Sequence, residues 1–157
     1  MKRAIIIGAT SGIGREVAKC LLLDGWRIGI AGRRQSALEY LQQTAPDQIE
    51  IQALDVTAEN AVEKLNVLID KVGGMDLFLL SSGIGFQNLK LNLDVELDTA
   101  RTNVEGVIRM VDTAFAYFGK NGGGHLAVIS SIAGTKGLGV APAYSATKRF
   151  QNTYIDA

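Results

Sequence analysis

A tyrosine and a lysine near the end of the chain have the spacing of an acid–base pair. Tyr144 and Lys148 stand four residues apart in the segment Tyr-Ser-Ala-Thr-Lys. On a helix, this spacing places both side chains on one face, one turn apart. Free tyrosine has a pKa of about 10 and is a poor base at neutral pH, whereas a nearby ammonium group favours the phenolate. The pair predicts general acid–base chemistry; the alternative is an ordinary amphipathic helix with a surface lysine.

Polar residues in two apolar segments upstream are further candidates for this chemistry. Ser130 and Ser131 end a short apolar run, and Ser131 lies 13 residues before Tyr144. A serine hydroxyl at a strand end can donate a hydrogen bond to a substrate carbonyl or accept one from an alcohol. Asn103 stands in an otherwise apolar helical stripe, where asparagine is unfavourable unless it serves a purpose. We predict functional roles for Ser131 and Asn103. Ser130 is the weaker of the two serines, and an exposed side chain is the alternative for Asn103.

A glycine-rich segment, residues 8–14, follows the first apolar run and opens onto a helical pattern. Glycine permits a tight turn at the first position, backbone approach to a pyrophosphate at the second, and close helix–strand packing at the third. The helix that follows offers free N–H groups and a positive dipole end to phosphates. A turn without a ligand is the alternative. We predict a dinucleotide site that binds through Gly8, Thr10, Ser11, Gly12, Ile13 and Gly14.

The end of the second apolar run bears on which dinucleotide binds. An acidic residue there would hold the ribose 2′-OH of NAD, but the expected position, 18 residues past Gly14, is Gly32. Arg33 and Arg34 follow directly, and guanidinium groups hold phosphate bidentately. This pattern favours NADP, with NAD as the alternative if the arginines are only solvated surface charge.

Short apolar runs alternate with helical patterns along the whole chain. The runs cover residues 4–7, 27–31, 49–54, 77–80 and 126–130, and the helical patterns cover residues 14–24, 36–44, 58–72, 94–118 and 142–157. Such alternation indicates βαβ units, and continuous apolar strands indicate a parallel sheet that is covered on both faces. We predict an α/β, doubly wound (Rossmann-like) sheet of about five strands, forming a single NAD(P)-binding domain over residues 1–157.

Composition excludes several other classes of protein. The chain of 157 residues balances 16 Lys and Arg against 16 Asp and Glu, which does not support a broad basic face for nucleic acid or anionic membrane. The single cysteine, Cys20, cannot form an internal disulfide and is expected in the core. His125 has no metal-ligating partner at suitable spacing, so no metal site is predicted. No apolar run reaches the length of a membrane span. We therefore expect a cytoplasmic location.

Together, these motifs resemble the short-chain dehydrogenase/reductase family over essentially the whole chain. The resemblance implies an NADP-dependent oxidoreductase that moves a hydride between nicotinamide and a carbonyl or secondary alcohol. Tyr144 is then the general acid or base, and Lys148 favours its phenolate and holds the nicotinamide ribose. Ser131, at the family's interval from the tyrosine, orients the carbonyl. Asn103 bends its helix, holds a water and completes a tetrad.

The resemblance also adds cofactor contacts and a departure. It implies that Asp55 and the Val56 amide reach the adenine ring, although Asp55 could equally cap a helix. Residues 80–83 read Leu-Ser-Ser-Gly where the family usually has Asn-Asn-Ala-Gly. Ser82 and Gly83 are still expected beside the cofactor. The departure puts in doubt the side-chain hydrogen bonds that stabilise the sheet rather than the chemistry.

Two expectations concern the protein as a whole. The family continues through two more strands, a helix and a substrate-binding loop, so we expect the chain to be an N-terminal part or a truncated form. A small-molecule substrate and a homodimer or tetramer are expected from the resemblance. The competing hypothesis is a dinucleotide-binding regulatory module without catalysis.

Overall fold

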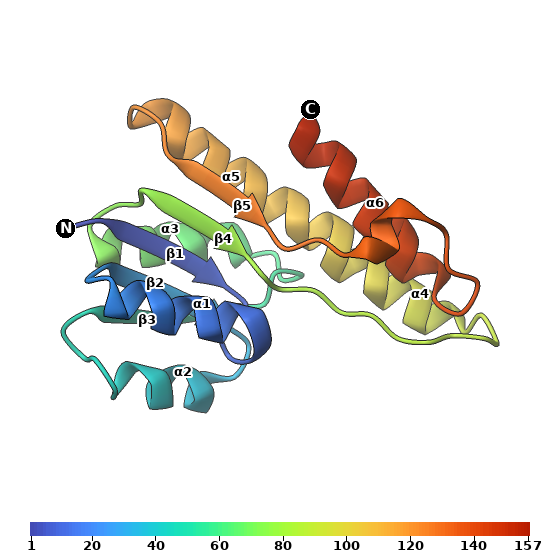
Figure 1. Ribbon diagram of the computed structural model, residues 1–157, viewed down its shortest axis with the longest axis horizontal. Helices are drawn as coiled ribbons and strands as arrows, with labels where there is room; N and C mark the ends of the chain where they lie inside the picture. Colours follow the sequence, from blue (N-terminus) through green and yellow to red (C-terminus); the bar gives the residue numbers. More distant parts are fainter.

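Five parallel strands form one sheet in the order β3-β2-β1-β4-β5 (Figure 1). The structure, a computed structural model, describes all 157 residues. The strands are β1 (Arg3–Ile7), β2 (Arg27–Gly32), β3 (Ile49–Ala53), β4 (Leu77–Leu80) and β5 (His125–Val128). The chain moves outward from β1 to β3 and then returns to the other side of β1, which creates a switch point between β1 and β4. The predicted doubly wound sheet is confirmed.

The helices cover both faces of this sheet and extend past its carboxyl edge. They are α1 (Gly12–Leu23), α2 (Gln35–Gln42), α3 (Ala61–Val72), α4 (Leu93–Ala100), α5 (Gly106–Lys120) and α6 (Pro142–Asp156). A π-helical turn, η1 (Arg101–Glu105), joins α4 to α5, and a 3-10 turn, η2 (Ile132–Thr135), precedes α6. In Figure 1, α4 and α6 lie beyond the carboxyl ends of the strands. None of the helices has the length and hydropathy needed to cross a membrane.

Residues of β1 alternate between two separate cores. Ile5 and Ile7 pack with α3 and α5, and Ala4 and Ile6 pack with α1 and α2. Neighbouring residues of a strand point to opposite faces of the sheet, so a strand that is covered on both sides must be apolar throughout. This explains the unbroken run Ala-Ile-Ile-Ile, in which every residue is buried.

The structure refines three details of the expected elements. The segment 94–118 is interrupted by η1, which contains Asn103, the residue at which the resemblance implied a bend. Cys20 is exposed and not part of the core, because the face of α1 turned to the sheet carries Gly14 and Ala18. On α5, Phe115 is 73% exposed, and the buried stripe passes through Val107, Met110, Val111, Ala114 and Phe118.

An arginine–aspartate fork fixes the amino end of the β1–β4 pair. Arg3 donates from Nε to Asp76 Oδ2 at 3.0 Å and from Nη2 to Asp76 Oδ1 at 2.8 Å. The backbone N–H groups of the two residues also donate, Arg3 N to Asp76 Oδ2 at 2.8 Å and Asp76 N to Arg3 O at 2.9 Å. The hydrogen bond from the Arg3 side chain is the main cause that holds the pKa of Asp76 below its usual value. The fork supports the register in which Ile7 pairs with Leu80 at the carboxyl end.

We predict that Asp76→Asn lowers stability in a pH-dependent way. The side chains of Arg3 and Asp76 are 34% and 41% exposed, so solvent screening limits the expected loss to about 1 kcal/mol at neutral pH. Because the folded pKa lies below the unfolded value of about 4, the carboxylate contributes fully above that value. Its contribution disappears as the pH falls through the folded pKa. Urea unfolding of both forms between neutral and acidic pH measures this difference. The exposed change Asp70→Asn is the control, and a gap of constant size across the pH range would contradict the prediction.

Candidate functional site

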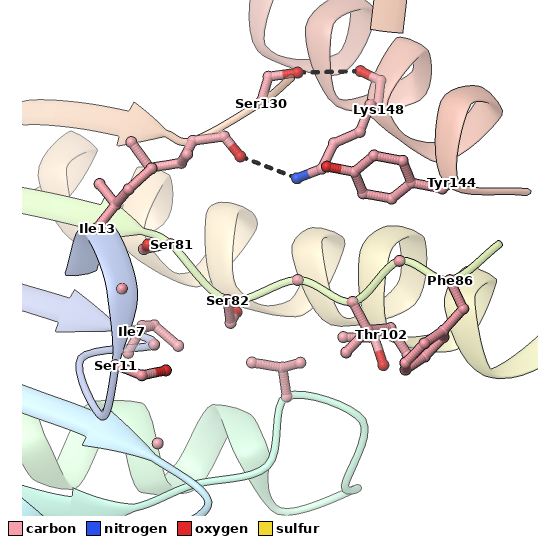
Figure 2. A pocket seen from close by; sticks show the side chains of 18 of the residues that line it. Ile7, Ser11, Ile13, Ser81, Ser82, Phe86, Thr102, Ser130, Tyr144 and Lys148 are labelled. Atoms are coloured by element: carbon pink, nitrogen blue, oxygen red, sulfur yellow. Dashed lines mark hydrogen bonds between the residues drawn. The ribbon is translucent and has the colours of Figure 1, made fainter. Parts of the chain in front are cut away.

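A cavity of about 800 Å³ lies at the carboxyl ends of the strands, at the switch point between β1 and β4. It extends from the glycine loop to α6, and Figure 2 shows its lining side chains. The structure brings most of the predicted site residues into this one cavity. They are Gly8, Thr10, Ser11, Gly12, Ile13, Arg33, Asp55, Val56, Ser82, Gly83, Tyr144 and Lys148. Four predicted residues do not line it, namely Gly14, Arg34, Asn103 and Ser131.

Two glycines let the loop fold tightly between β1 and α1. Gly8 has a φ of +91°, and a Cβ there would lie 2.5 Å from the backbone nitrogen of Ser82. A Cβ on Gly14 would overlap the carbonyl oxygen of Gly8, which explains why Gly14 is buried outside the cavity. Ser11, at the N-cap of α1, makes no side-chain bond to the first turn. The amides at this helix start are therefore not capped by a side chain and can face an anion.

The two arginines after β2 have different positions. Arg33 lines the cavity. Arg34 lies outside it and donates from Nη2 to the carbonyl oxygen and the hydroxyl of Thr10, at 3.2 and 3.3 Å. A Cβ on Gly32 would lie 2.6 Å from Thr10 Cγ2, so this position has little room for an acidic side chain. Arg33 can therefore meet a ligand directly, while Arg34 braces the loop that would hold one.

Asp55 forms a tight turn at the end of β3 rather than capping α3. Its Oδ1 accepts from Thr57 N at 2.9 Å and from Thr57 Oγ1 at 2.7 Å, and the N-cap of α3 is Asn60. Burial of Asp55 favours its neutral form, but the Thr57 hydrogen bonds and the nearby Arg33 charge outweigh this and lower the pKa of Asp55. Asp55 therefore presents a charged carboxylate to the cavity.

Lys148 is buried beside Tyr144 on α6. It is only 5% exposed, and its Nζ donates to the carbonyl oxygen of Ile129 and to Gln151 Oε1, each at 3.0 Å. The same nitrogen lies 5.8 Å from the centroid of the Tyr144 ring, which Figure 2 shows directed toward Lys148. Burial lowers the pKa of Lys148. The predicted pair thus shares one face of α6 and faces the cavity.

The segment after β4 forms the surface on which this pair rests. A Cβ on Gly83 would lie 3.4 Å from Lys148 Nζ, and one on Gly85 would lie 2.7 Å from Tyr144 Cε2. The Tyr144 ring therefore packs directly over the backbone of Gly85. Sequence reasoning missed Gly85, although the Gly-Ile-Gly pattern at residues 83–85 was the available signal.

Asn103 is fully buried in η1 and clamps this segment to α6. Its Oδ1 accepts from Ile84 N at 2.9 Å, while its Nδ2 donates to Ile84 O at 2.6 Å and to Thr147 Oγ1 at 3.1 Å. The alternative of an exposed asparagine is wrong. A π-helical turn within an α-helix is often found at a functional site, and here it carries the residue that connects two walls of the cavity.

The N-terminus of α6 is held by a residue from another helix. Its own N-cap, Ala141, has no capping side chain, and Pro142 occupies the first turn. Glu96 of α4 supplies the missing acceptor, because its Oε2 accepts from Ala143 N at 2.9 Å. Its other oxygen accepts from Asn88 Nδ2 at 2.8 Å. Glu96 thereby fixes the helix turn that carries Tyr144, a role with no signal in the sequence.

The two serines after β5 differ in what they face. Ser130 lines the cavity and donates from Oγ to Asn152 Oδ1 at 2.5 Å. Ser131 begins η2, and its Oγ accepts from Ala133 N at 3.1 Å. Ser131 keeps its own hydroxyl hydrogen for donation, but the structure places its neighbour, not Ser131, on the cavity wall.

The titratable groups of the cavity suit proton transfer. Tyr144, Lys148, Arg33 and Asp55 are the ionisable residues that line it. No group of three or more His, Cys, Asp or Glu side chains in the protein is arranged to hold a metal ion. The glycine loop, the two walls and the Tyr144–Lys148 pair together form one cavity, with the pair at one end.

One known protein family matches nearly the whole chain. The sequence model of a family described as short chain dehydrogenase matches residues 2–157. The chain belongs to this family.

Individual relatives agree with this assignment. A protein of Myxococcus xanthus named as an uncharacterized oxidoreductase is 34% identical over 99% of this chain and 64% of its own length. Among solved structures, an actinorhodin polyketide ketoreductase with NADPH has a TM-score of 0.89 and 25% identity, over 98% of this chain and 62% of that one. An alcohol dehydrogenase from Thermococcus sibiricus, complexed with 5-hydroxy-NADP, has the same score and identity over 99% and 69%. The chain thus spans less than two thirds of its Myxococcus relative.

In this family member, packing and a backbone hydrogen bond hold residues 80–83, where Leu-Ser-Ser-Gly replaces the usual Asn-Asn-Ala-Gly. Leu80 is 1% exposed and packs in the core formed with α3 and α5. Ser81 donates its backbone N–H to Ile7 O at 2.8 Å and lines the cavity. Apolar packing and the strand ladder hold this strand end in place of side-chain amides.

We predict that Gly85→Ala impairs proton transfer without unfolding the protein. The added methyl group must displace the Tyr144 ring, and a misplacement of about 1 Å in an active site can cost about 100-fold in rate. Binding at the distant glycine loop should remain. Dinucleotide titration and carbonyl-reduction assays measure the two effects. Gly119→Ala, where an added Cβ has no neighbour within 4 Å, is the matched control. Equal turnover in the two variants would show that Gly85 does not position Tyr144.

Proposed function

We propose that the chain is the cofactor-binding part of an NADP-dependent oxidoreductase acting on a carbonyl or secondary-alcohol substrate. The observation that carries this proposal is the shared cavity, which is lined by the glycine loop at one end and by Tyr144 and Lys148 at the other. The solved relatives named above include a ketoreductase and an alcohol dehydrogenase, each with an NADP-type cofactor. The Rossmann-like sheet, with the cavity at its switch point, supports the same function.

The residues present fit an NADP cofactor. Gly8 and Gly12 leave the loop without side-chain bulk, and the start of α1 offers amides to the pyrophosphate. Arg33 would hold the 2′-phosphate, and Asp55 with the Val56 amide would reach the adenine. Lys148 would hold the nicotinamide ribose. When bound, the cofactor supplies or takes the hydride, which the amino acids themselves cannot provide.

The acid–base step belongs to the chain's own residues. In reduction, the Tyr144 hydroxyl gives its proton to the substrate oxygen; in oxidation, it takes that proton back. The positive charge of Lys148 favours the phenolate and is little screened by water, because Lys148 is buried. Ser131 is proposed to donate its hydroxyl hydrogen to the substrate oxygen, and Asn103 to support a water relay at η1. Ser130, which lines the cavity, is the alternative donor, and its hydroxyl would have to turn away from Asn152 Oδ1 to act.

We predict that Tyr144→Phe abolishes turnover but leaves NADPH binding intact. The change removes the only proton that the tyrosine can exchange and keeps the ring that packs on Gly85. NADPH oxidation with a panel of carbonyl compounds, together with a fluorescence titration of NADPH, measures both properties. The control is Tyr154→Phe on the same helix, where the hydroxyl donates to exposed Asp112. Retained turnover in Tyr144→Phe would refute the assignment.

We predict that Arg33→Ala weakens NADP binding and leaves NAD binding nearly unchanged. A charge-assisted contact to the 2′-phosphate is worth about 1.5–3 kcal/mol, which corresponds to a loss of about 10-fold or more in NADP affinity. Calorimetric titration of both cofactors into the wild type and the variant gives the ratio. Arg15→Ala, in which the removed side chain pairs with exposed Glu16, is the control. Equal losses for the two cofactors would rule out this role for Arg33.

A dinucleotide-binding regulatory module without turnover is the second candidate. The position of Ser131 off the cavity wall favours it, as a silent module needs no carbonyl-orienting hydroxyl. NADPH binding without oxidation by any carbonyl compound would support this candidate. We further propose a homodimer or tetramer, because apolar side chains such as Phe115 are exposed on the long helices. We also propose a cytoplasmic location, in keeping with the single cysteine.

A further inference from the structure

Lys148 is buried without a negative partner. Its Nζ bonds only to two neutral oxygens, one from the Ile129 backbone and one from the Gln151 side chain. The Tyr144 ring lies beside it, with its centroid 5.8 Å from the nitrogen, and burial alone, with no charged partner, shifts the pKa of Lys148. The charged groups on neighbouring elements are engaged elsewhere: Glu96 with Asn88 and Ala143, Arg101 with Asp98, and Glu105 with Arg109. Arg149, also on α6, is exposed.

Gln151 connects this ammonium group to the π-helical turn. The side chain is 1% exposed, and both ends of its amide are used. Its Oε1 accepts from Lys148 Nζ at 3.0 Å, and its Nε2 donates to the backbone oxygen of Asn103 at 2.9 Å. The orientation of the amide follows from chemistry, because an ammonium can only donate and a carbonyl can only accept.

We propose that Gln151 is a positioning residue that holds Lys148 in place and keeps its charge available to Tyr144. The proposal rests on the proposed function, in which Tyr144 and Lys148 form the acid–base pair. A neutral amide oxygen stabilises the ammonium without cancelling its charge. A carboxylate in the same place would bind the ammonium more strongly, but it would also offset the positive field that reaches the tyrosine. The bond to Asn103 keeps the amide from turning away.

The direct test is the titration of Lys148 in the full natural chain. Heteronuclear NMR follows the Cε–Hε signals of lysines with pH, and a Lys148→Arg sample assigns the signal. Gln151→Met keeps the size of the side chain but removes the acceptor, so the pKa of Lys148 should fall by about one unit. Gln151→Glu adds a carboxylate, so the pKa should rise above the wild-type value. Gln43→Met, a similar change at an exposed position, should leave it unchanged.

A second measurement separates positioning from simple packing. The pH at which oxidation of an alcohol by NADP reaches half its maximal rate reports the phenolate of the acid–base pair. This pH should rise in Gln151→Glu, because the added negative charge opposes the phenolate. A purely structural role would lower the rate at all pH values without moving this midpoint.

The outcomes distinguish this proposal from the proposed function. If Lys148 titrates alike in the wild type, Gln151→Met and Gln151→Glu, the role of Gln151 is wrong, whatever the turnover. Should Gln151→Met fail to fold, Gln151→Glu still tests the direction of the shift. A wild type that binds NADPH but never oxidises it would count against the proposed function, while the NMR titration would still decide the role of Gln151.

Discussion

The burial of one ammonium group without a carboxylate partner is the constraint on which the site depends. An isolated charge in the interior costs several kcal/mol unless polar groups compensate for it. Two neutral acceptors compensate the charge of Lys148: the carbonyl oxygen of Ile129, just after β5, and the side-chain oxygen of Gln151 on the same helix. Because these acceptors are neutral, the positive charge remains uncancelled beside Tyr144. The proposed acid–base role of Tyr144 depends on this uncancelled charge, because a nearby ammonium favours a phenolate.

The sheet connects this charged end of the cavity to its glycine end. The β1–β4 register brings Gly8 against the backbone of Ser82, and the residues that follow, 83–85, then run beneath Tyr144 and Lys148. A shift of one residue in this pair would move the loop and the floor of the acid–base pair together. The Arg3–Asp76 fork lies at the far end of the same pair and favours one register. The proposed cofactor site and the proposed proton-transfer site thus both lie at the carboxyl end of one strand pair.

The five strands, the helices between them and the Tyr–Lys pair were predictable from the sequence, because periodicity and spacing encode them locally. The resemblance implied a bend at Asn103, but the contacts that Asn103 makes at η1 and the contact of Gly85 with Tyr144 were not predictable. These features depend on contacts between segments that are distant in the chain, such as Asn103 with Thr147, 44 residues apart. Cys20 was placed in the core because its neighbours are leucines, yet the helix turns it outward. Composition alone does not give the face of a short helix.

The departure at residues 80–83 shows how the cavity tolerates change in the residues around it. The fold is shared with solved relatives at 25% identity and a TM-score of 0.89. The cavity needs from this strand end a backbone that passes close to Gly8 and Lys148. Packing can hold a backbone in this position as well as side-chain hydrogen bonds can. Leu80 supplies the packing on one face of the sheet, and the ladder bond from Ser81 to Ile7 supplies the alignment. The positions that cannot change in this way are those where an added Cβ would meet the backbone or the Tyr144 ring. A substitution at a neighbouring residue cannot relieve an overlap with the main chain.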